Sequence, residues 1–278
     1  MVVRSDPLKG VQIMIHSTHQ GSGSPPLVFV HAFGCARSDW DEQLRFFSDR
    51  HELVAVDLGG HGTTPARPEH RWVETHGADV AALVGELNLA PAVIVGNSLG
   101  CRVALEVAAR AAAHTRALIL VDGSRLGDAQ STANAILGNG VAASEYAGFV
   151  VPMFAKMFSP GCAPSTVTAM TERAQRMPAP LAVSLLADVA RHDAQKMDGL
   201  LASLSVPVHL VQSTLITADG ERVSLRQGQT SPYIEMMKSK VADLSIDIVE
   251  DSGHYPQIER PLETNAAIAQ FLRRLETL

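Results

Sequence analysis

One pentapeptide, Gly96–Gly100 with the sequence Gly-Asn-Ser-Leu-Gly, constrains the fold of this chain more than any other stretch. It follows the apolar run Ala92–Val95 and precedes a segment of helical character, Cys101–Arg110. A serine between two glycines, at a sharp turn from a strand into a helix, is the arrangement that exposes a nucleophilic hydroxyl above a sheet. Both glycines are needed because bulkier residues would collide with the neighbouring strand and helix. The pentapeptide therefore predicts a strand–turn–helix unit with Ser98 at its apex.

Apolar runs and helical segments alternate along the chain. We expect strands at Val11–Ile15, Leu27–Val30, Leu53–Val56, Ala92–Val95, Ala117–Val121, Val206–Val211 and Leu244–Val249. We expect helices at Asp39–Phe47, Val80–Leu87, Cys101–Arg110, Pro232–Val241 and Leu262–Leu275, and a long loop at Gln212–Ser231. Fully apolar runs fit a sheet that is buried on both faces. The alternation predicts an α/β fold with a mostly parallel, doubly wound sheet.

The alternation stops between Leu126 and Ser203, where we find no convincing strand. Alanine, methionine, proline and polar residues dominate this stretch, which we interpret as a mostly helical insertion. We therefore divide the chain into a core of residues 1–125 and 204–278 and a helical cap of residues 126–203. Because the cap connects two strands at the carboxyl edge of the sheet, we expect it to lie over Ser98 as a lid.

The composition limits the partners and the compartment. Hydrophobic residues make up 46% of the 278 residues, enough for a large core, and the net charge of −6 argues against nucleic acid as a partner. No apolar stretch approaches the roughly 20 residues that span a bilayer, and Met1–Gln20 lacks the apolar core of a secretion signal. The three cysteines, Cys35, Cys101 and Cys162, are expected to be free thiols. We expect a cytoplasmic protein that binds a small-molecule substrate, needs no cofactor and does not associate with a membrane. The sequence leaves open whether it forms a homodimer.

Four motifs follow four of the expected strands. They are His31–Gly34, Asp57–Gly62, Gly96–Gly100 and Gly253-His254. With these motifs, nearly the whole chain resembles the α/β-hydrolase superfamily, and in particular its serine hydrolases with a helical cap. The resemblance implies an α/β-hydrolase fold whose cap is inserted after the family's sixth strand, here Ala117–Val121. It also implies that His31 and His61 have structural roles.

The resemblance assigns roles to four residues. Ser98 would be the nucleophile, and His254 would be the general base that takes its proton and later returns it. The backbone N–H groups of Phe33 and Leu99 would form the oxyanion hole. These donors would face the oxygen on which negative charge develops.

The third member of the triad has two candidates, because the chain departs from the family's usual pattern. The family most often places an aspartate after its seventh strand, but Gln212–Ile216 contains no acid, and the first acid beyond it is Asp219. The family's other position is the end of the sixth strand, where this chain has Asp122. We favour Asp122 as the partner of His254 and keep Asp219 as the alternative.

The fold alone does not decide the reaction, because function depends on the site. A serine at position 98 excludes the aspartate nucleophile of related dehalogenases and epoxide hydrolases. The leading hypothesis is hydrolysis of a carboxylic ester. Hydrolysis of a carbon–carbon bond, a lactone or an amide would use the same residues. Two other classes stay open: a cofactor-free dioxygenase of a hydroxy-heteroaromatic ring, with His254 as the base, and a hydrolase-like ligand receptor.

The cap gives an indication of the substrate. Its larger apolar residues are Met153, Phe154, Met157, Phe158, Met170, Met177, Leu181, Leu185, Leu186 and Met197. Methionine lines adaptable apolar pockets, so we expect a mid-sized, largely apolar substrate, although these residues equally fit a small core within the cap. Arg125 and Arg222 lie on loops that flank the expected site. Either could bind a substrate carboxylate, and the alternative is that both are ordinary solvated arginines.

Overall fold

The computed structural model describes residues 15–89, 91–126, 143–217 and 221–277. Its main sheet consists of β1 (Ser17–Gln20), β2 (Leu27–Val30), β3 (Leu53–Val56), β4 (Ala92–Asn97), β5 (Thr115–Val121), β6 (Val208–Gln212) and β9 (Leu244–Ile248). The seven strands are arranged in the order β1-β3-β2-β4-β5-β6-β9. Only the edge strand β1 runs antiparallel to its neighbour, so the predicted mostly parallel sheet is confirmed.

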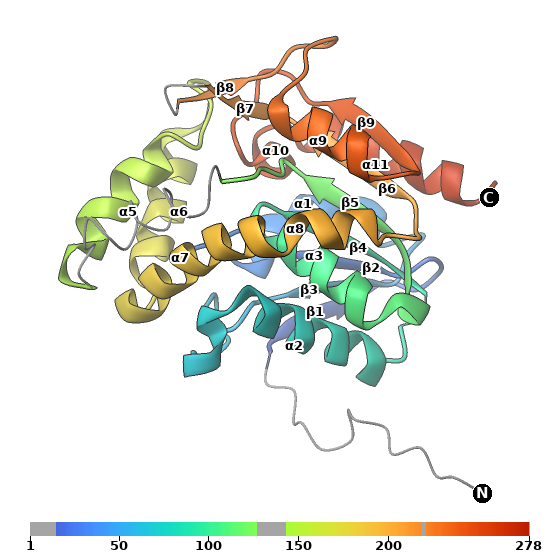
Figure 1. The fold of residues 1–278 in the computed structure, drawn as a ribbon, viewed down its shortest axis with the longest axis horizontal. Coiled ribbons are helices and arrows are strands. Elements are labelled where there is room, and N and C mark those ends of the chain that lie inside the picture. Colours follow the sequence, from blue (N-terminus) through green and yellow to red (C-terminus); the bar gives the residue numbers. More distant parts are fainter. Residues whose placement is uncertain (1–14, 90, 127–142, 218–220, 278) are drawn as a thin grey trace, which may run out of the picture.

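Helices cover both faces of this sheet (Figure 1). The α-helices of the described residues are α1 (Asp41–Phe47), α2 (Val73–Glu86), α3 (Leu99–Arg110), α5 (Tyr146–Ala155), α6 (Pro164–Gln175), α7 (Ala179–Gln195), α8 (Met197–Ala202), α9 (Pro232–Lys240), α10 (Pro256–Glu259) and α11 (Pro261–Leu275). Short 3-10 helices lie at Arg37–Trp40, Pro68–Arg71, Ala112–His114 and Ala143–Glu145. The doubly wound α/β fold is therefore confirmed.

Alternate residues of each central strand point to opposite faces of the sheet. In β2, Leu27 and Phe29 pack with α1 and α11, whereas Val28 and Val30 pack with α2 and α3. All four side chains are fully buried, which explains why the strand is apolar throughout. Burying one such side chain stabilises the fold by about 1.5–3 kcal/mol.

The segment between β5 and β6 is helical over its described residues, 143–203, and contains no strand there, as predicted. In Figure 1, α5 and α6 lie beyond one end of the sheet, while α7 runs back toward α3. Phe154 and Leu185 are fully buried in the same apolar cluster as Val28 of the sheet. The methionines Met170, Met177 and Met197 are also buried in that cluster. The inserted helices therefore pack onto the core through a continuous apolar interior.

Three local predictions differ from the structure. The loop expected at Gln212–Ser231 contains a two-stranded hairpin of β7 (Thr214–Ile216) and β8 (Arg222–Ser224), so that prediction is wrong. Strands of three residues are too short to show a periodic pattern. The helix expected from Val80 begins earlier, at Val73. The strand expected at Val11–Ile15 falls almost wholly outside the described residues, and β1 begins at Ser17.

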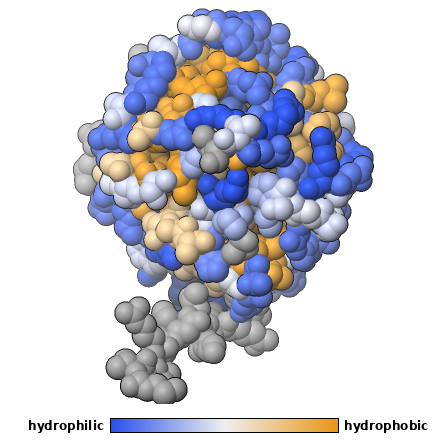
Figure 2. Space-filling view, turned by 90° about the vertical axis from the view of Figure 1, so that its right-hand side faces the viewer, coloured by the Kyte–Doolittle hydropathy of each residue, from blue (hydrophilic) through white to orange (hydrophobic). Residues whose placement is uncertain are grey.

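The surface mixes polar and apolar residues. Figure 2 shows one face of the molecule, on which hydrophilic side chains surround smaller hydrophobic areas. The large hydrophobic side chains that are exposed include Phe46, Trp72, Val151, Ile216, Val223 and Leu262, which come from different elements. Within the described ranges, no helix has both the length and the apolar character needed to cross a membrane.

Candidate active site

Ser98 occupies the sharp turn between β4 and α3 that the sequence predicts. Its backbone has φ = 55° and ψ = −107°, a strained conformation for a residue other than glycine. A Cβ on Gly96 would lie 2.1 Å from the carbonyl oxygen of Gly100, and a Cβ on Gly100 would lie 2.2 Å from the carbonyl oxygen of Val30. Only glycine fits at either position, because a side chain would collide with the adjoining helix or strand, as the sequence predicts.

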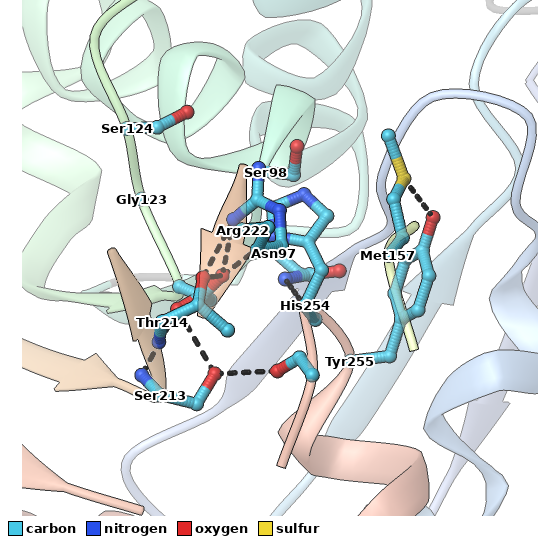
Figure 3. A network of polar contacts seen from close by, with 12 residues as sticks. Asn97, Ser98, Gly123, Ser124, Met157, Ser213, Thr214, Arg222, His254 and Tyr255 are labelled. Carbon is cyan, nitrogen blue, oxygen red and sulfur yellow. Dashed lines mark hydrogen bonds and ion pairs between the residues drawn. The ribbon is translucent and has the colours of Figure 1, made fainter. Parts of the chain in front are cut away.

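The structure brings together Asp122, at the carboxyl end of β5, and His254, in the loop after β9. The Nδ1 atom of His254 lies 2.6 Å from Oδ2 of Asp122 (Figure 3). The side-chain amide of Asn97, next to Ser98, donates a hydrogen bond of 3.2 Å to the carbonyl oxygen of His254. Of the two candidate acids, Asp122 therefore contacts the predicted base, whereas Asp219 lies outside the described residues.

The carboxylate of Asp122 accepts hydrogen bonds on both of its oxygens. The backbone N–H groups of Ser213 and Thr214 donate to Oδ1 at 2.9 and 2.7 Å, as does the Ser213 hydroxyl at 2.9 Å. Besides His254, Oδ2 accepts from the Thr214 hydroxyl at 2.7 Å and from Nη1 of Arg222 at 3.1 Å. Burial alone would raise the pKa of this carboxyl, but the hydrogen bond from His254, the positive charge of Arg222 and the Thr214 hydroxyl lower it. Asp122 is therefore held as a fixed carboxylate.

The imidazole of His254 is neutral at physiological pH. Burial, followed by the charge of Arg222, lowers its pKa to about 4, against the opposing effect of Asp122. Because ionised Asp122 can only accept a hydrogen bond, Nδ1 carries the ring proton and donates it to that bond, and the lone pair of the neutral ring is on Nε2. In Figure 3, the Ser98 hydroxyl and the His254 ring lie on the same side of the polar network. A neutral imidazole with this tautomer can act as a base.

The loop after β2 orients the peptide between Ala32 and Phe33. The Ala32 carbonyl oxygen lies 2.7 Å from Nδ1 of His31 and accepts a bond of 3.2 Å from the Cys35 N–H. The other ring nitrogen of His31, Nε2, accepts from the Leu58 N–H at 3.0 Å. Since the carbonyl and the N–H of a trans peptide point in opposite directions, the carbonyl bonds also fix the direction of the Phe33 N–H. His31 thus has the structural role that was expected for it.

A buried ion pair beside Ser98 was not anticipated. Arg102, one helical turn after Ser98, donates to Asp193 of α7 from Nε at 2.7 Å and from Nη2 at 2.5 Å. The same guanidinium donates to the carbonyl oxygens of Ser98 at 3.1 Å and Ser124 at 2.9 Å. The signal that the sequence offers is an arginine within the apolar stretch Leu99–Leu105. This pair links the inserted helices to the turn that carries Ser98.

The two arginines expected near the site both line one cavity of about 310 Å³. Arg222, on β8, contacts Asp122 and donates to the Thr214 hydroxyl at 2.6 Å. Arg125 donates to Asp198 at 2.9 Å. Arg222 is therefore a neighbour of the Asp122–His254 pair, a contact that sequence reasoning missed because the hairpin was taken for a loop.

The cysteines are free thiols, as expected. Burial raises the pKa of Cys35 well above its usual value and that of Cys101 to about 12. Both groups therefore stay protonated and weakly nucleophilic at neutral pH. In the part of the chain that the structure describes, no group of three or more histidine, cysteine, aspartate or glutamate side chains could hold a metal ion.

A family model described as the alpha/beta hydrolase family matches residues 27–267 of this chain. The chain belongs to the alpha/beta hydrolase family. Among curated proteins, this chain is 25% identical over 269 residues to the dihydrolipoyllysine-residue acetyltransferase component of the acetoin cleaving system of Pseudomonas putida. The match covers 91% of this chain but only 65% of that protein, so the chain spans less than two thirds of its length.

Two solved structures illustrate the shared fold. A thermophilic esterase from Thermogutta terrifontis superposes with a TM-score of 0.77 at 21% identity, covering 94% of this chain and 93% of the esterase. The enol-lactonase from Burkholderia xenovorans LB400 gives a TM-score of 0.77 at 18% identity, with 93% and 96% covered. At these identities, the likeness shows that the fold is the same.

Proposed function

We propose that this protein is a serine hydrolase that cleaves a carboxylic ester or a related acyl bond, with Ser98, His254 and Asp122 as its catalytic triad. The observation that carries the proposal is the 2.6 Å contact between Nδ1 of His254 and the buried Asp122 carboxylate, beside the strained turn that exposes Ser98. Family membership and the esterase and lactonase folds support it.

Each residue has a defined role in the proposed reaction. Nε2 of His254 takes the proton of the Ser98 hydroxyl as the oxygen attacks the substrate carbonyl. The N–H groups of Phe33 and Leu99 stabilise the negative charge on the carbonyl oxygen. His254 then returns the proton to the leaving alcohol, and water releases the acyl group from Ser98 by the same steps. Asp122 keeps the imidazole in the required tautomer and stabilises its transient positive charge.

The inserted segment supplies apolar surface next to the predicted base. The N–H of His254 donates a hydrogen bond of 2.6 Å to the Met157 carbonyl oxygen, and the Tyr255 hydroxyl lies 3.0 Å from Met157 Sδ (Figure 3). The Phe158 ring packs on Tyr255 with 5.1 Å between centroids. These contacts support a mid-sized substrate that is largely apolar around its reactive carbonyl, bound beneath the cap of residues 126–203.

The test is turnover of p-nitrophenyl acetate and butyrate, with both the burst and the steady state recorded. We expect a burst from the wild type and loss of turnover in Ser98→Ala and His254→Ala. Ser239→Ala and His19→Ala change exposed residues of the same types and should behave as wild type. Retention of most of the wild-type rate by Ser98→Ala would contradict a serine nucleophile, and oxygen uptake with a hydroxy-heteroaromatic compound would then point to the dioxygenase class.

A further inference from the structure

The cavity that holds both arginines lies between the end of β5, the β7–β8 hairpin and the amino end of α9. Gly123 and Ser124 form one wall, Leu215 of β7 another, and Tyr233 of α9 a third. Its volume of about 310 Å³ is at the lower end of the range for small-molecule sites, roughly 300–1,000 Å³. The cavity therefore suits one short part of a substrate.

The charges around this cavity favour an anion. Two guanidinium groups, those of Arg125 and Arg222, line it, and none of the described lining residues is an aspartate or a glutamate. Ser231 and Pro232, at the amino end of α9, also line it, and the amino end of a helix carries a partial positive charge. Each guanidinium group also pairs with one carboxylate that does not line the cavity, Arg125 with Asp198 at 2.9 Å and Arg222 with Asp122 at 3.1 Å. The cationic groups, and not their carboxylate partners, therefore face the cavity.

Both arginines keep donors for a further partner. Arg222 bonds Asp122 through Nη1 at 3.1 Å, and Arg125 bonds Asp198 through Nη1 at 2.9 Å and Met236 Sδ through the same atom at 3.4 Å. Among the described contacts, none uses Nε or Nη2 of either side chain. These two nitrogens form the edge of the guanidinium fork that binds a carboxylate with two parallel hydrogen bonds.

The cavity is also next to the proposed triad. Arg222 bonds the same oxygen of Asp122 that contacts His254. The guanidinium group of Arg102 donates to the carbonyl oxygens of both Ser98 and Ser124. A single side chain therefore contacts both the cavity wall and the residue that carries the nucleophile. In the view of Figure 3, Arg222 lies between Gly123–Ser124 and the His254 ring. A group bound in the cavity can therefore belong to the molecule whose carbonyl is at Ser98.

The geometry points to a carboxylate-binding subsite formed by Arg125 and Arg222, so that the preferred substrates are half-esters or lactones that carry a free carboxylate. This inference rests on the proposed hydrolase function and narrows its substrate class. The carboxylate accepts hydrogen bonds from Nε and Nη2 of the two arginines, while the acyl carbonyl of the same molecule lies at Ser98. With a half-ester, Ser98 displaces the alcohol, which takes the proton from His254, and water then releases the dicarboxylic acid from Ser98. With a lactone, the same steps open the ring to a single hydroxy acid that keeps the carboxylate.

The experiment compares mono-4-nitrophenyl glutarate with its methyl ester, which has the same reactive ester but no charge at the far end. We expect the wild type to prefer the acid by about tenfold in kcat/KM, and Arg125→Gln to remove most of that preference through KM. Arg125→Lys keeps the charge and should keep part of the preference. The control is Arg226→Gln, an exposed arginine that pairs with Asp251 at 2.6 Å and does not line the cavity, and it should leave the ratio unchanged.

A binding measurement separates this inference from the proposed reaction. We expect calorimetry to detect glutarate binding to Ser98→Ala, and no binding when Arg125→Gln is added. Equal turnover of the two esters by the wild type, or a ratio unchanged in Arg125→Gln, would overturn the subsite while leaving the hydrolase intact. Arg125-dependent binding of glutarate without turnover of either ester would leave the subsite standing and overturn the hydrolase.

Discussion

His31 and His254 are both buried histidines whose pKa is lowered, chiefly by burial, yet their ring nitrogens have different partners. In His31, Nδ1 contacts the Ala32 carbonyl oxygen and Nε2 accepts from the Leu58 N–H, so both nitrogens are engaged by the backbone. In His254, Nδ1 contacts the carboxylate of Asp122, and the described residues provide no hydrogen bond to Nε2.

This difference shows what turns a buried imidazole into a base. Burial keeps both rings neutral, but only His254 has a free lone pair and a negative partner that can stabilise the charged ring during the reaction. A neutral carbonyl, as at His31, provides little of that stabilisation. The partners of the ring, and not its burial, therefore separate the catalytic role proposed for His254 from the structural role of His31.

The largest effect should follow from removing the negative partner. In Asp122→Asn, the amide can donate to Nδ1 of His254, which favours the wrong tautomer, and we expect kcat to fall by about 10⁴-fold. Ester turnover measures the loss, and thermal unfolding checks that the protein remains folded. Asp219→Asn tests the other candidate acid. If Asp219→Asn lost more activity than Asp122→Asn, the pairing of Asp122 with His254 would not be the functional one.

A smaller effect is expected when His31 is truncated. His31→Ala leaves the buried Leu58 N–H unpaired and removes one of the two contacts that hold the Ala32 carbonyl oxygen, so we expect kcat to fall by about 10–100-fold and stability by about 1–3 kcal/mol. His51→Ala is the matched control, because His51 is also buried and contacts a backbone carbonyl, that of Pro25, at 2.9 Å. Equal losses of kcat in the two variants would show that His31 has no specific effect on the oxyanion loop.

Arg222 should affect the pH dependence more than the maximal rate. Its positive charge lowers the pKa of His254, so Arg222→Gln should raise that pKa and move the acid limb of kcat/KM to higher pH, by about one unit. Arg222→Lys should keep most of the original profile. The profile is measured with a neutral ester, so that substrate charge does not contribute. An acid limb that stays in place in Arg222→Gln would show that this charge does not reach His254.

The smallest effect is expected at Thr214, whose hydroxyl is one of several donors to Asp122. Thr214→Val keeps the shape but removes the 2.7 Å hydrogen bond, and the remaining donors hold the carboxylate, so we expect kcat/KM to fall by about threefold. Thr230→Val, which removes an exposed hydroxyl that donates to Glu235, is the control. A loss as large as that of Asp122→Asn would mean that the donors act as one inseparable network.

The sequence predicted the features that depend on local constraints. The turn at Ser98 was predictable because Gly96 and Gly100, two residues on either side of the serine, stand where a side chain would collide with neighbouring backbone. Asp122 could be named as one of two acids because the resemblance implies a triad acid at the end of the family's sixth strand, where Asp122 follows an apolar run. Choosing between them required the position of His254, 132 residues away in the chain, which no local pattern encodes.

The features that were missed depend on short elements and distant partners. The three-residue strands β7 and β8 leave no periodic signal, so the hairpin that carries Arg222 to Asp122 could not be foreseen. Arg102 and Asp193 are 91 residues apart, and the sequence around either residue gives no sign that the two form an ion pair. Their pairing depends on how α7 packs against α3.

That ion pair limits how the inserted segment can move or be exchanged. Swinging the whole insertion away from the core would separate two charges that are almost fully buried and break the bidentate contact between them. Opening is therefore easier at α5 and α6, which lie farther from this anchor, than at α7. A chimera that received the cap of another family member would need an acid in the place of Asp193, or Arg102 would be left as an unpaired charge directly beneath Ser98.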